Sequence, residues 1–286
     1  MLLSAAGCQT QTLRPAPRTV ALQSQTGAIV GTIHLEPGKP PALWPLRTIE
    51  GVEVTRAFPF RDDVPGESHD HPHHRSMWSA HGDVNGVDFW HEGGRVEHDS
   101  IRNYQDGAVE VAGRWIDGDG QSMLTSRTLW RAVDDGGTRT VVLRVVLEPV
   151  GGPVVFGDTK EGTLAIRLAS QLRLTGDVAG GTLANSEGMS GAGVWGRGAT
   201  WIEVTGRIED TPVKLRLTHA SFVEQVLGAD SVPEEDALVV RWHARPYGLI
   251  AANPFGERAF VGSGEAKETI VERGQQLVLT LVVTVE

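Results

Sequence analysis

The chain has 286 residues, of which 40% are hydrophobic and 22% are charged, and its formal net charge is -10. This composition is typical of a globular protein and excludes a disordered chain. The acidic balance argues against nucleic acid or an anionic membrane surface as a partner.

The N-terminal segment MLLSAAGC contains the only cysteine of the chain, Cys8. Small residues between a leucine pair and a cysteine resemble the end of a bacterial lipoprotein signal, although the charged region and most of the apolar region of such a signal are missing. Two interpretations stay open: a lipid-anchored periplasmic or outer-surface protein, or a cytoplasmic protein with an incidental cysteine. From Pro17 onward there is no cysteine, which excludes thiol catalysis, cysteine-ligated zinc and disulfides in the folded body. No apolar run approaches the ~18 residues that span a bilayer.

Alternating apolar and polar residues dominate the chain and predict strands bounded by turns rich in glycine and aspartate. Only 221–229 has helical spacing. Because there is no fixed-period repeat and no proline-rich linker, we expect a tail over 1–16 and one domain over 17–286. The predicted fold is all-β, a single large antiparallel β-sandwich with little helix. The predicted strands cover 19–24, 28–36, 51–60, 108–116, 122–133, 138–150, 163–174, 213–221, 237–244 and 277–286.

The stretch HDHPHHRSMWSAHGDVNGVDFWH, at 69–91, contains six of the ten histidines. Pro72 cannot donate to a β-ladder, so the stretch is predicted to start as an edge or loop. GDVNG has turn chemistry, and the whole stretch predicts loop, strand, turn and strand, which would return His81 and Trp90 to one area. Histidine titrates near neutral pH and is the commonest metal ligand, so acid–base chemistry and metal binding both stay open.

Two acidic turns are the next candidates. Lys160 and Glu161 follow Asp158 just before a strong predicted strand, and Glu187 lies in the turn NSEG of a glycine-rich loop with two tryptophans. Long polar loops with aromatic residues frequently carry binding sites. Both turns are also ordinary solvated sequences, so a structural role is the competing interpretation.

The strand RWHAR, which precedes PYGLIAANPFG, places several cations together. Alternation puts Arg241, His243 and Arg245 on one face of this strand and Trp242 on the other. Three cations on one face repel one another unless carboxylates or an anionic ligand lie nearby. This face is therefore a stronger functional indication than any single member.

Several familiar signatures are absent from the sequence. There is no Gly-x-Ser-x-Gly elbow, phosphate-binding glycine loop, dinucleotide fingerprint or His-Glu-x-x-His pair. The remaining inventory of His, Asp, Glu, Lys, Arg and Trp suits acid–base work on a carbohydrate. In such a site carboxylate or imidazole moves protons, arginine holds an oxyanion or uronate, and indoles stack on sugar rings.

PGESHDHPHHRSMWSAHGDVNGVDFW resembles the hallmark of a bacterial family labelled PmoA-like, and TKEGTLAIR, NSEG, WG and RWHARPYGLIAANPFG follow in that family's order. The resemblance covers approximately residues 40–285. Its label borrows the name of a membrane-embedded methane monooxygenase subunit, whereas this sequence has no transmembrane pattern, so we do not predict methane oxidation. The resemblance implies a β-supersandwich of the galactose-mutarotase type and a role in sugar metabolism.

By that analogy, histidines and a glutamate on a concave sheet move protons on a carbohydrate or glycoside, in a hydrolysis, elimination or epimerisation. The predicted general acid is His74 or His81, and the predicted base or nucleophile is Glu161 or Glu187. The predicted catalytic residues are His74, His81, Glu161 and His243. The predicted substrate-binding residues are Arg75, Trp90, Lys160, Glu187, Arg245 and Asn253.

Two other functions stay open. A metal-dependent enzyme could hold a divalent metal on three or four of the histidines with Asp83 or Glu161, although HPHH has no recognised ligand spacing; we assign no metal ligands and no cofactor. A non-catalytic sugar-binding module needs only the tryptophans. The sequence makes no prediction of the oligomeric state.

Overall fold

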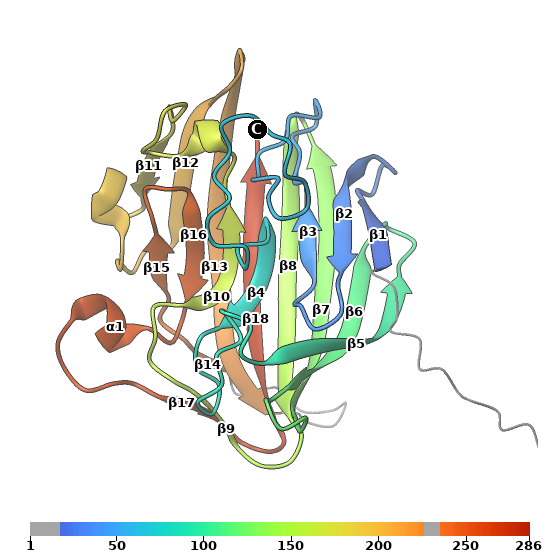
Figure 1. The fold of residues 1–286 in the computed structure, drawn as a ribbon, viewed down its shortest axis with the longest axis vertical. Coiled ribbons are helices and arrows are strands. Elements are labelled where there is room, and N and C mark those ends of the chain that lie inside the picture. Colours follow the sequence, from blue (N-terminus) through green and yellow to red (C-terminus); the bar gives the residue numbers. More distant parts are fainter. Residues whose placement is uncertain (1–17, 226–234) are drawn as a thin grey trace, which may run out of the picture.

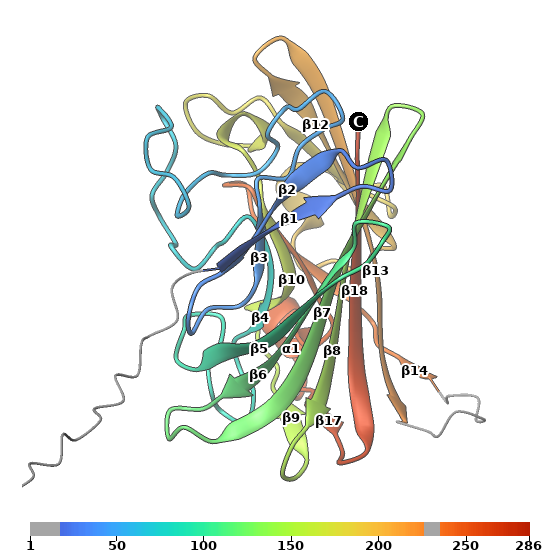
Figure 2. The same cartoon turned by 90° about the vertical axis from the view of Figure 1, so that its right-hand side faces the viewer.

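The fold was analysed in a computed structural model that describes residues 18–225 and 235–286. Almost all regular structure in this part of the chain is β-strand, arranged in two antiparallel sheets that face each other (Figures 1 and 2). The predicted all-β sandwich is therefore confirmed. Cys8, with its predicted lipid anchor, lies outside the described residues.

The smaller sheet has seven strands in the order β1-β2-β3-β4-β10-β16-β15. Their bounds are β1 (Arg18–Gln23), β2 (Ile29–Leu35), β3 (Ala42–Trp44), β4 (Met77–His81), β10 (Gly162–Arg167), β15 (Arg241–Ala244) and β16 (Leu249–Asn253).

The larger sheet has nine strands, in the order β11-β12-β13-β18-β8-β7-β6-β5 with β14 beside β13. Their bounds are β5 (Arg95–Asn103), β6 (Val109–Ile116), β7 (Ser122–Asp135), β8 (Thr138–Pro149), β11 (Thr182–Asn185), β12 (Trp201–Ile208), β13 (Thr211–Gln225), β14 (Glu235–Ala237) and β18 (Gln275–Val285).

The remaining elements connect these sheets. β9 (Val154–Phe156) pairs with β17 (Thr269–Val271). The short helical elements are η1 (Ser170–Leu172), η2 (Gly191–Val194) and α1 (Glu257–Val261). None of the helices in the described part of the chain has the length and apolar character needed to cross a bilayer.

One hydrophobic core lies between the two sheets. Met77 and Ile166 of the smaller sheet pack into the same buried cluster as Val145 and Leu281 of the larger sheet. The alternation of the sequence produces this core directly, because every second residue of a strand points to the same face. Burial of this apolar surface is the main stabilisation of the sandwich.

Several predictions of secondary structure are wrong. Residues 51–60 form turns and isolated bridges at positions 53 and 55 in place of a strand, and Pro59 in this stretch has no N–H for a β-ladder. Residues 221–225 continue β13, because their pairing with β18 outweighs a short helical spacing. The rest of the predicted helix, 226–229, lies outside the described residues.

The stretch 69–91 forms only one strand. β4 matches the predicted strand around MWSAH, but the expected second strand is a turn in which the backbone N–H groups of Phe89 and Trp90 both donate to the carbonyl oxygen of His81. This turn nevertheless carries Trp90 back over the sheet, next to Trp78.

Candidate functional site

The candidate site lies on the face of the smaller sheet that points away from the core. Figure 2 shows the segment between β3 and β4 on this outer side of the sheet. In register, His243 lies beside Ala251, Ala251 beside Ala165, and Ala165 beside Trp78. Because neighbouring strands are ~4.8 Å apart, the backbones of His243 and Trp78 are separated by about 14 Å.

Small side chains between these two residues make room for aromatic rings. Ala165 and Ala251 form a buried cluster with Trp78 and Trp90, against which the half-buried Tyr247 packs. The Trp78 and Trp90 ring centroids are 5.2 Å apart. The loops around β4 and β16 therefore place an aromatic layer directly on the sheet.

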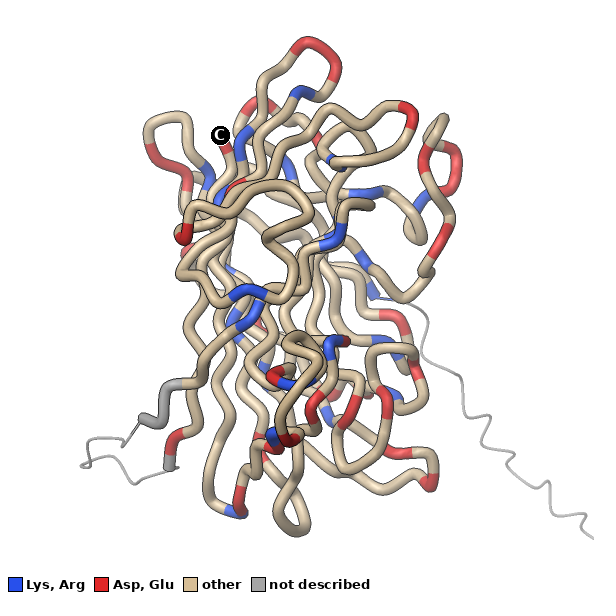
Figure 3. The backbone as a smooth tube through the Cα atoms, turned by 90° about the vertical axis from the view of Figure 1, so that its left-hand side faces the viewer, with Lys and Arg blue, Asp and Glu red and all other residues tan. Residues whose placement is uncertain are grey.

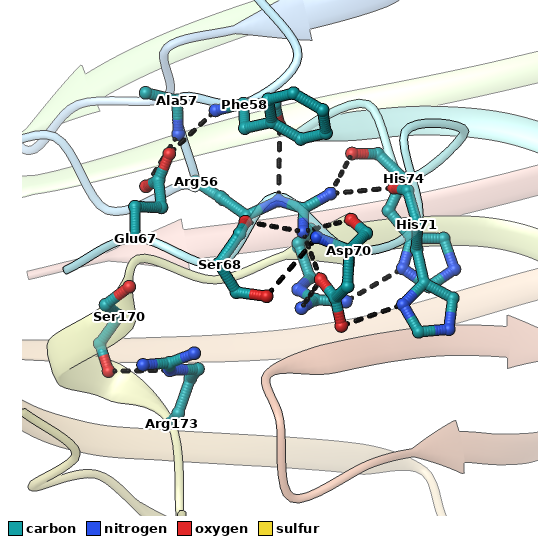
Figure 4. Close-up of polar contacts among 11 residues, drawn as sticks. Arg56, Ala57, Phe58, Glu67, Ser68, Asp70, His71, His74, Ser170 and Arg173 are labelled. Carbon is teal, nitrogen blue, oxygen red and sulfur yellow. Dashed lines mark hydrogen bonds and ion pairs between the residues drawn. The ribbon is translucent and has the colours of Figure 1, made fainter. Parts of the chain in front are cut away.

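A single buried arginine holds the histidine-rich loop on this layer (Figure 4). Arg56 is 2% exposed, and its guanidinium donates to the carbonyl oxygens of Phe58, Ser68, Asp70, His71 and His74 at 2.8–3.3 Å. It also donates to the Asp70 carboxylate at 2.7 Å. The loop thus satisfies its backbone acceptors on one cation.

A second buried arginine fixes the chemical state of His74. Arg167 donates from Nη2 to Asp70 Oδ1 at 2.8 Å, and its Nη1 lies 2.9 Å from His74 Nδ1. Because a guanidinium can only donate, His74 Nδ1 must be the acceptor, and the proton of the neutral imidazole is on Nε2. The structure therefore assigns His74 as an Nε2–H hydrogen-bond donor.

Charge and burial agree with this assignment. Burial and then the positive charge of Arg167 lower the pKa of His74 far below its usual range. Burial would raise the pKa of Asp70, but Arg167 and the hydrogen bonds from His71 and Ser68 outweigh it and lower that pKa to about 2. At neutral pH the network therefore contains ionised arginines, an ionised Asp70 and an uncharged His74.

The other histidines of the loop extend this layer to the surface. The ring of His74 stacks with the ring of His71, at a centroid distance of 4.7 Å, and with Trp78 at 5.4 Å. His73 lies between His74 and His91, and burial and the charge of His91 lower its pKa to about 4. At neutral pH this cluster provides aromatic faces and N–H groups.

Glu161 and His243 form the second half of the site. Glu161 Oε2 lies 3.8 Å from His243 Nδ1, and the two side chains are 21% and 2% exposed. Lys160 Nζ lies 3.2 Å from Glu161 Oε1. Burial and then the charges of Arg245 and Lys160 lower the pKa of His243 to about 3, so its imidazole is neutral at physiological pH. Its Nδ1 is a buried polar atom for which no hydrogen-bond partner is found among the described residues.

The structure thus brings together four predicted residues, His74, Glu161, His243 and Arg245, through the aromatic Tyr247. Arg245 lies over the Tyr247 ring at 5.7 Å, and His74 lies 6.3 Å from the same ring. Burial raises the pKa of Tyr247, and the charges of Arg167 and Arg245 lower it only in part. Trp90 and Lys160 also lie at this site.

His81 is not part of this arrangement. It lies four residues after Met77 in β4, so both side chains point to the core. There His81 is 0% exposed and packs against Phe156 and Phe255. Its Nε2 donates to the carbonyl oxygen of Gly157 at 2.9 Å, and burial lowers its pKa to about 4. The structure places it where it cannot reach a ligand on the outer face.

Three predicted substrate-binding residues have structural partners. Asn253 donates to the carbonyl oxygen of Thr159 at 2.7 Å and is 0% exposed. Arg75 is buried and pairs with Glu36 at 2.7 Å. Glu187 lies on an exposed turn after β11, on the larger sheet, where it accepts a hydrogen bond from Ser186. The geometry gives these three residues roles in holding loops.

The sequence did not single out Arg56, Asp70 or Arg167. The two arginines sit at polar positions of predicted strands, where they look like ordinary solvent-facing residues. The alternation of the strand offered one signal. In TLAIR, Arg167 lies on the same face as Ala165 and Thr163, whose side chains are small and uncharged.

Metal chemistry has little support in the geometry. In residues 18–225 and 235–286, no three His, Cys, Asp or Glu side chains converge as metal ligands. Three Nδ1 atoms are engaged: that of His71 with Asp70, that of His74 with Arg167, and that of His91 with Asp88. Metal binding by the histidines stays an untested alternative.

A surface depression of about 240 Å³ lies away from these residues, between the turns at 117–123 and 151–154. Two of its polar side chains are already bonded: Asn85 accepts from the N–H of Val155, and Asp117 from those of Asp119 and Gln121. We place the candidate site instead on the outer face of the smaller sheet, where ionisable and aromatic side chains lie together.

The fold is similar to parts of several carbohydrate-active enzymes. The α-galactosidase AgaA of Geobacillus stearothermophilus matches at a TM-score of 0.46 and 12% identity, over 93% of this chain and 40% of that one. The galactosidase domain of an α-galactosidase–sucrose kinase matches at 0.42 and 9%, over 94% and 40%. A polysaccharide lyase matches at 0.32 and 12%, over 93% and 32%. The chain therefore spans less than half the length of these proteins.

No curated protein matches the sequence. One family model, in contrast, matches residues 32–286, which include the whole larger sheet, the smaller sheet from the middle of β2 onward and every residue of the candidate site. The chain belongs to the family described as "Family of unknown function (DUF6807)".

Proposed function

We propose that the outer face of the smaller sheet binds a sugar and that Glu161 moves a proton on it. The observation that carries this proposal is the pair formed by Glu161 Oε2 and His243 Nδ1, 3.8 Å apart, beside an aromatic layer. Sugars bind to aromatic faces and polar groups together, and a carboxylate next to an imidazole is a common arrangement for proton transfer.

Each residue has a distinct role in this proposal. Glu161, the more exposed partner, takes the proton of the anomeric hydroxyl group while the C1–O5 bond of the ring breaks and a water molecule protonates O5. Closure of the ring on the other face of the aldehyde reverses these proton transfers. His243 lies behind it as a neutral imidazole that orients the carboxylate. His74 donates from Nε2 to a sugar oxygen, and because it is uncharged it acts as a hydrogen-bond donor and not as a stored acid. Tyr247 and His71 provide the ring faces.

The reaction class that fits these groups is a proton-transfer reaction at the anomeric centre of the sugar, namely mutarotation. The second class, glycoside hydrolysis, needs two carboxyl groups placed on either side of the scissile bond. Two other carboxylates near this layer are already engaged: Asp70 is bound by Arg56 and Arg167, and Asp88 pairs with His91. The resemblance to PmoA-like proteins stays a prediction and points to the same class of substrate.

The test is a comparison of Glu161→Gln with the wild type. Aldose mutarotation is followed by polarimetry, and hydrolysis by release of 4-nitrophenol from a panel of glycosides. We expect Glu161→Gln to lower the rate about 10²–10⁴-fold, which is the usual contribution of a general base. The matched control is Glu187→Gln on the exposed turn of the larger sheet, which should keep the full rate.

Two results would overturn the proposal. If Glu161→Gln keeps full turnover, the proton-transfer role is wrong. If sugars bind but none reacts, the protein is a sugar-binding module, and the same surface serves recognition only.

A further inference from the structure

The sequence predicted that Arg241, His243 and Arg245 share one face and need a counter-charge. The structure accounts for the charge of the first two, which lie in β15. Arg241 pairs with Glu257 through two hydrogen bonds, at 2.8 Å and 2.6 Å. His243 is uncharged and faces Glu161. Arg245 is left.

Arg245 has no counter-ion among the residues that the structure describes. It is half-buried, its guanidinium lies 5.7 Å from the centroid of the Tyr247 ring, and its Nε is buried without a hydrogen-bond partner. None of the ion pairs in residues 18–225 and 235–286 includes it. A partly desolvated guanidinium without a carboxylate is costly unless a ligand supplies one.

The surrounding carboxylates are already engaged. Glu161 pairs with Lys160, and Asp70 is shared by Arg56 and Arg167. Arg167 also lies over the Tyr247 ring, at 4.6 Å, so two guanidinium groups flank this ring. The region around Tyr247 thus has excess positive charge, although the whole chain has a net charge of -10. Many of the acidic residues lie instead in loops at the two ends of the molecule (Figure 3).

We propose that the sugar bound at this site is an acidic sugar whose carboxylate is held by Arg245. The inference rests on the proposed function and names its substrate class. The planar fork of a guanidinium matches a carboxylate with two parallel hydrogen bonds, which gives both affinity and orientation. The neutral part of the sugar would then extend from Arg245 past the edge of Tyr247, with its hydroxyl groups toward Glu161 and His74.

The test is isothermal titration calorimetry on the whole chain with matched pairs of sugars at one ionic strength. The pairs are galacturonate with galactose and glucuronate with glucose; galactose 6-phosphate and acetate are the further probes. We expect at least one uronate to bind about tenfold or more tightly than its neutral partner. Arg245→Gln should abolish this preference and change the affinity for the neutral sugar by no more than about twofold.

The control is Arg241→Gln, four residues earlier at the start of β15, which should keep the preference because Arg241 already pairs with Glu257. If neutral sugars and uronates bind equally, or if Arg245→Gln keeps the preference, the inference is overturned while the proposed function stands. If galactose 6-phosphate is preferred and uronates are not, the anion is a phosphate and the carboxylate assignment is wrong. If acetate binds as tightly as the uronates, the site is a simple anion site. If no sugar of either class binds, the proposed function itself fails.

Discussion

The two faces of the smaller sheet are built from alternate residues of the same strands, yet they are held by different forces. Ile166 points to the core and is surrounded by aliphatic side chains, whereas the next residue, Arg167, points outward and bonds to Asp70 and His74. Both are 0% exposed. Burial alone therefore does not distinguish structural from functional residues; the chemistry of the partners does.

On the inner face, stability should fall in small steps as buried side-chain atoms are removed. On the outer face it depends on a few hydrogen bonds and ion pairs. On the inner face each methyl group adds a similar increment of stabilisation. On the outer face one guanidinium satisfies several carbonyl oxygens, so its removal leaves many acceptors unpaired at once. The following substitutions test this contrast.

The largest effect is expected for Arg56→Met. This change leaves the carbonyl oxygens of the histidine-rich loop without their donor and Asp70 with one cation fewer. We expect the free energy of unfolding in urea to fall by about 3–5 kcal/mol. Arg61→Met is the control, because its ion pairs with Glu53 and Asp63 are exposed and should contribute less than about 1 kcal/mol. Equal losses in the two variants would contradict the role of Arg56.

The inner face is tested by Ile166→Ala, which removes fully buried atoms and leaves a cavity. The expected loss is about 2–5 kcal/mol in the same urea experiment. Binding of a sugar by the remaining folded protein should be unchanged, because the side chain faces the opposite side of the sheet from the site. A variant with normal stability but no sugar binding would show that the two faces are not separate.

The third prediction concerns pH and His81. Its pKa is lowered from 6.5 to about 4 by burial in the core, so the unfolded chain takes up a proton at higher pH than the folded protein does. Stability should therefore be constant above pH 6.5 and fall between pH 6.5 and 4, by about 3 kcal/mol for this residue. The slope of unfolding free energy against pH should be shallower in His81→Gln, whereas His69→Gln, at an exposed position, should leave it unaltered.

The smallest effect is spectroscopic. The ¹⁵N chemical shifts of His74 should show a non-protonated Nδ1 and a protonated Nε2, unchanged from pH 8 to pH 5. In Arg167→Met the donor to Nδ1 is lost, and we expect a mixture of tautomers together with titration at a higher pH. A wild-type signal with the proton on Nδ1 would contradict the assignment.

Many strands of the sandwich could be predicted from the sequence, because apolar and polar residues alternate along a strand that has one buried face. β7, β8 and β18 were predicted for this reason. β5 was not, since its residues RVEHDSIRN are mostly polar on both faces at the edge of the sheet. The strand predicted at 51–60 failed because local alternation does not show whether a partner strand is present.

The sequence indicated which residue types form the candidate site, but it did not show on which face of the smaller sheet each side chain lies. His74, Glu161, His243 and Arg245 converge, whereas His81 belongs to the same motif and points to the core. MWSAH alternates Met77 and Ser79 with Trp78 and Ala80, and both sets are apolar enough to face a core. Only the pairing with β3 and β10 decides which set does. The tautomer of His74 likewise depends on Arg167, which is 93 residues away.

The alanines beneath the aromatic layer determine how far the aromatic rings of the site lie from the sheet. Ala165 and Ala251 carry no polar group, but Trp90 and Tyr247 rest in the same cluster as their methyl groups. One additional carbon at either position would lift the rings by about 1.5 Å, the length of a carbon–carbon bond. Reacting groups must be held within about 0.5 Å to act well. Homologues with valine or serine at these positions would therefore hold their ligands at a different depth, and substrate range could diverge without any change in the ionisable residues.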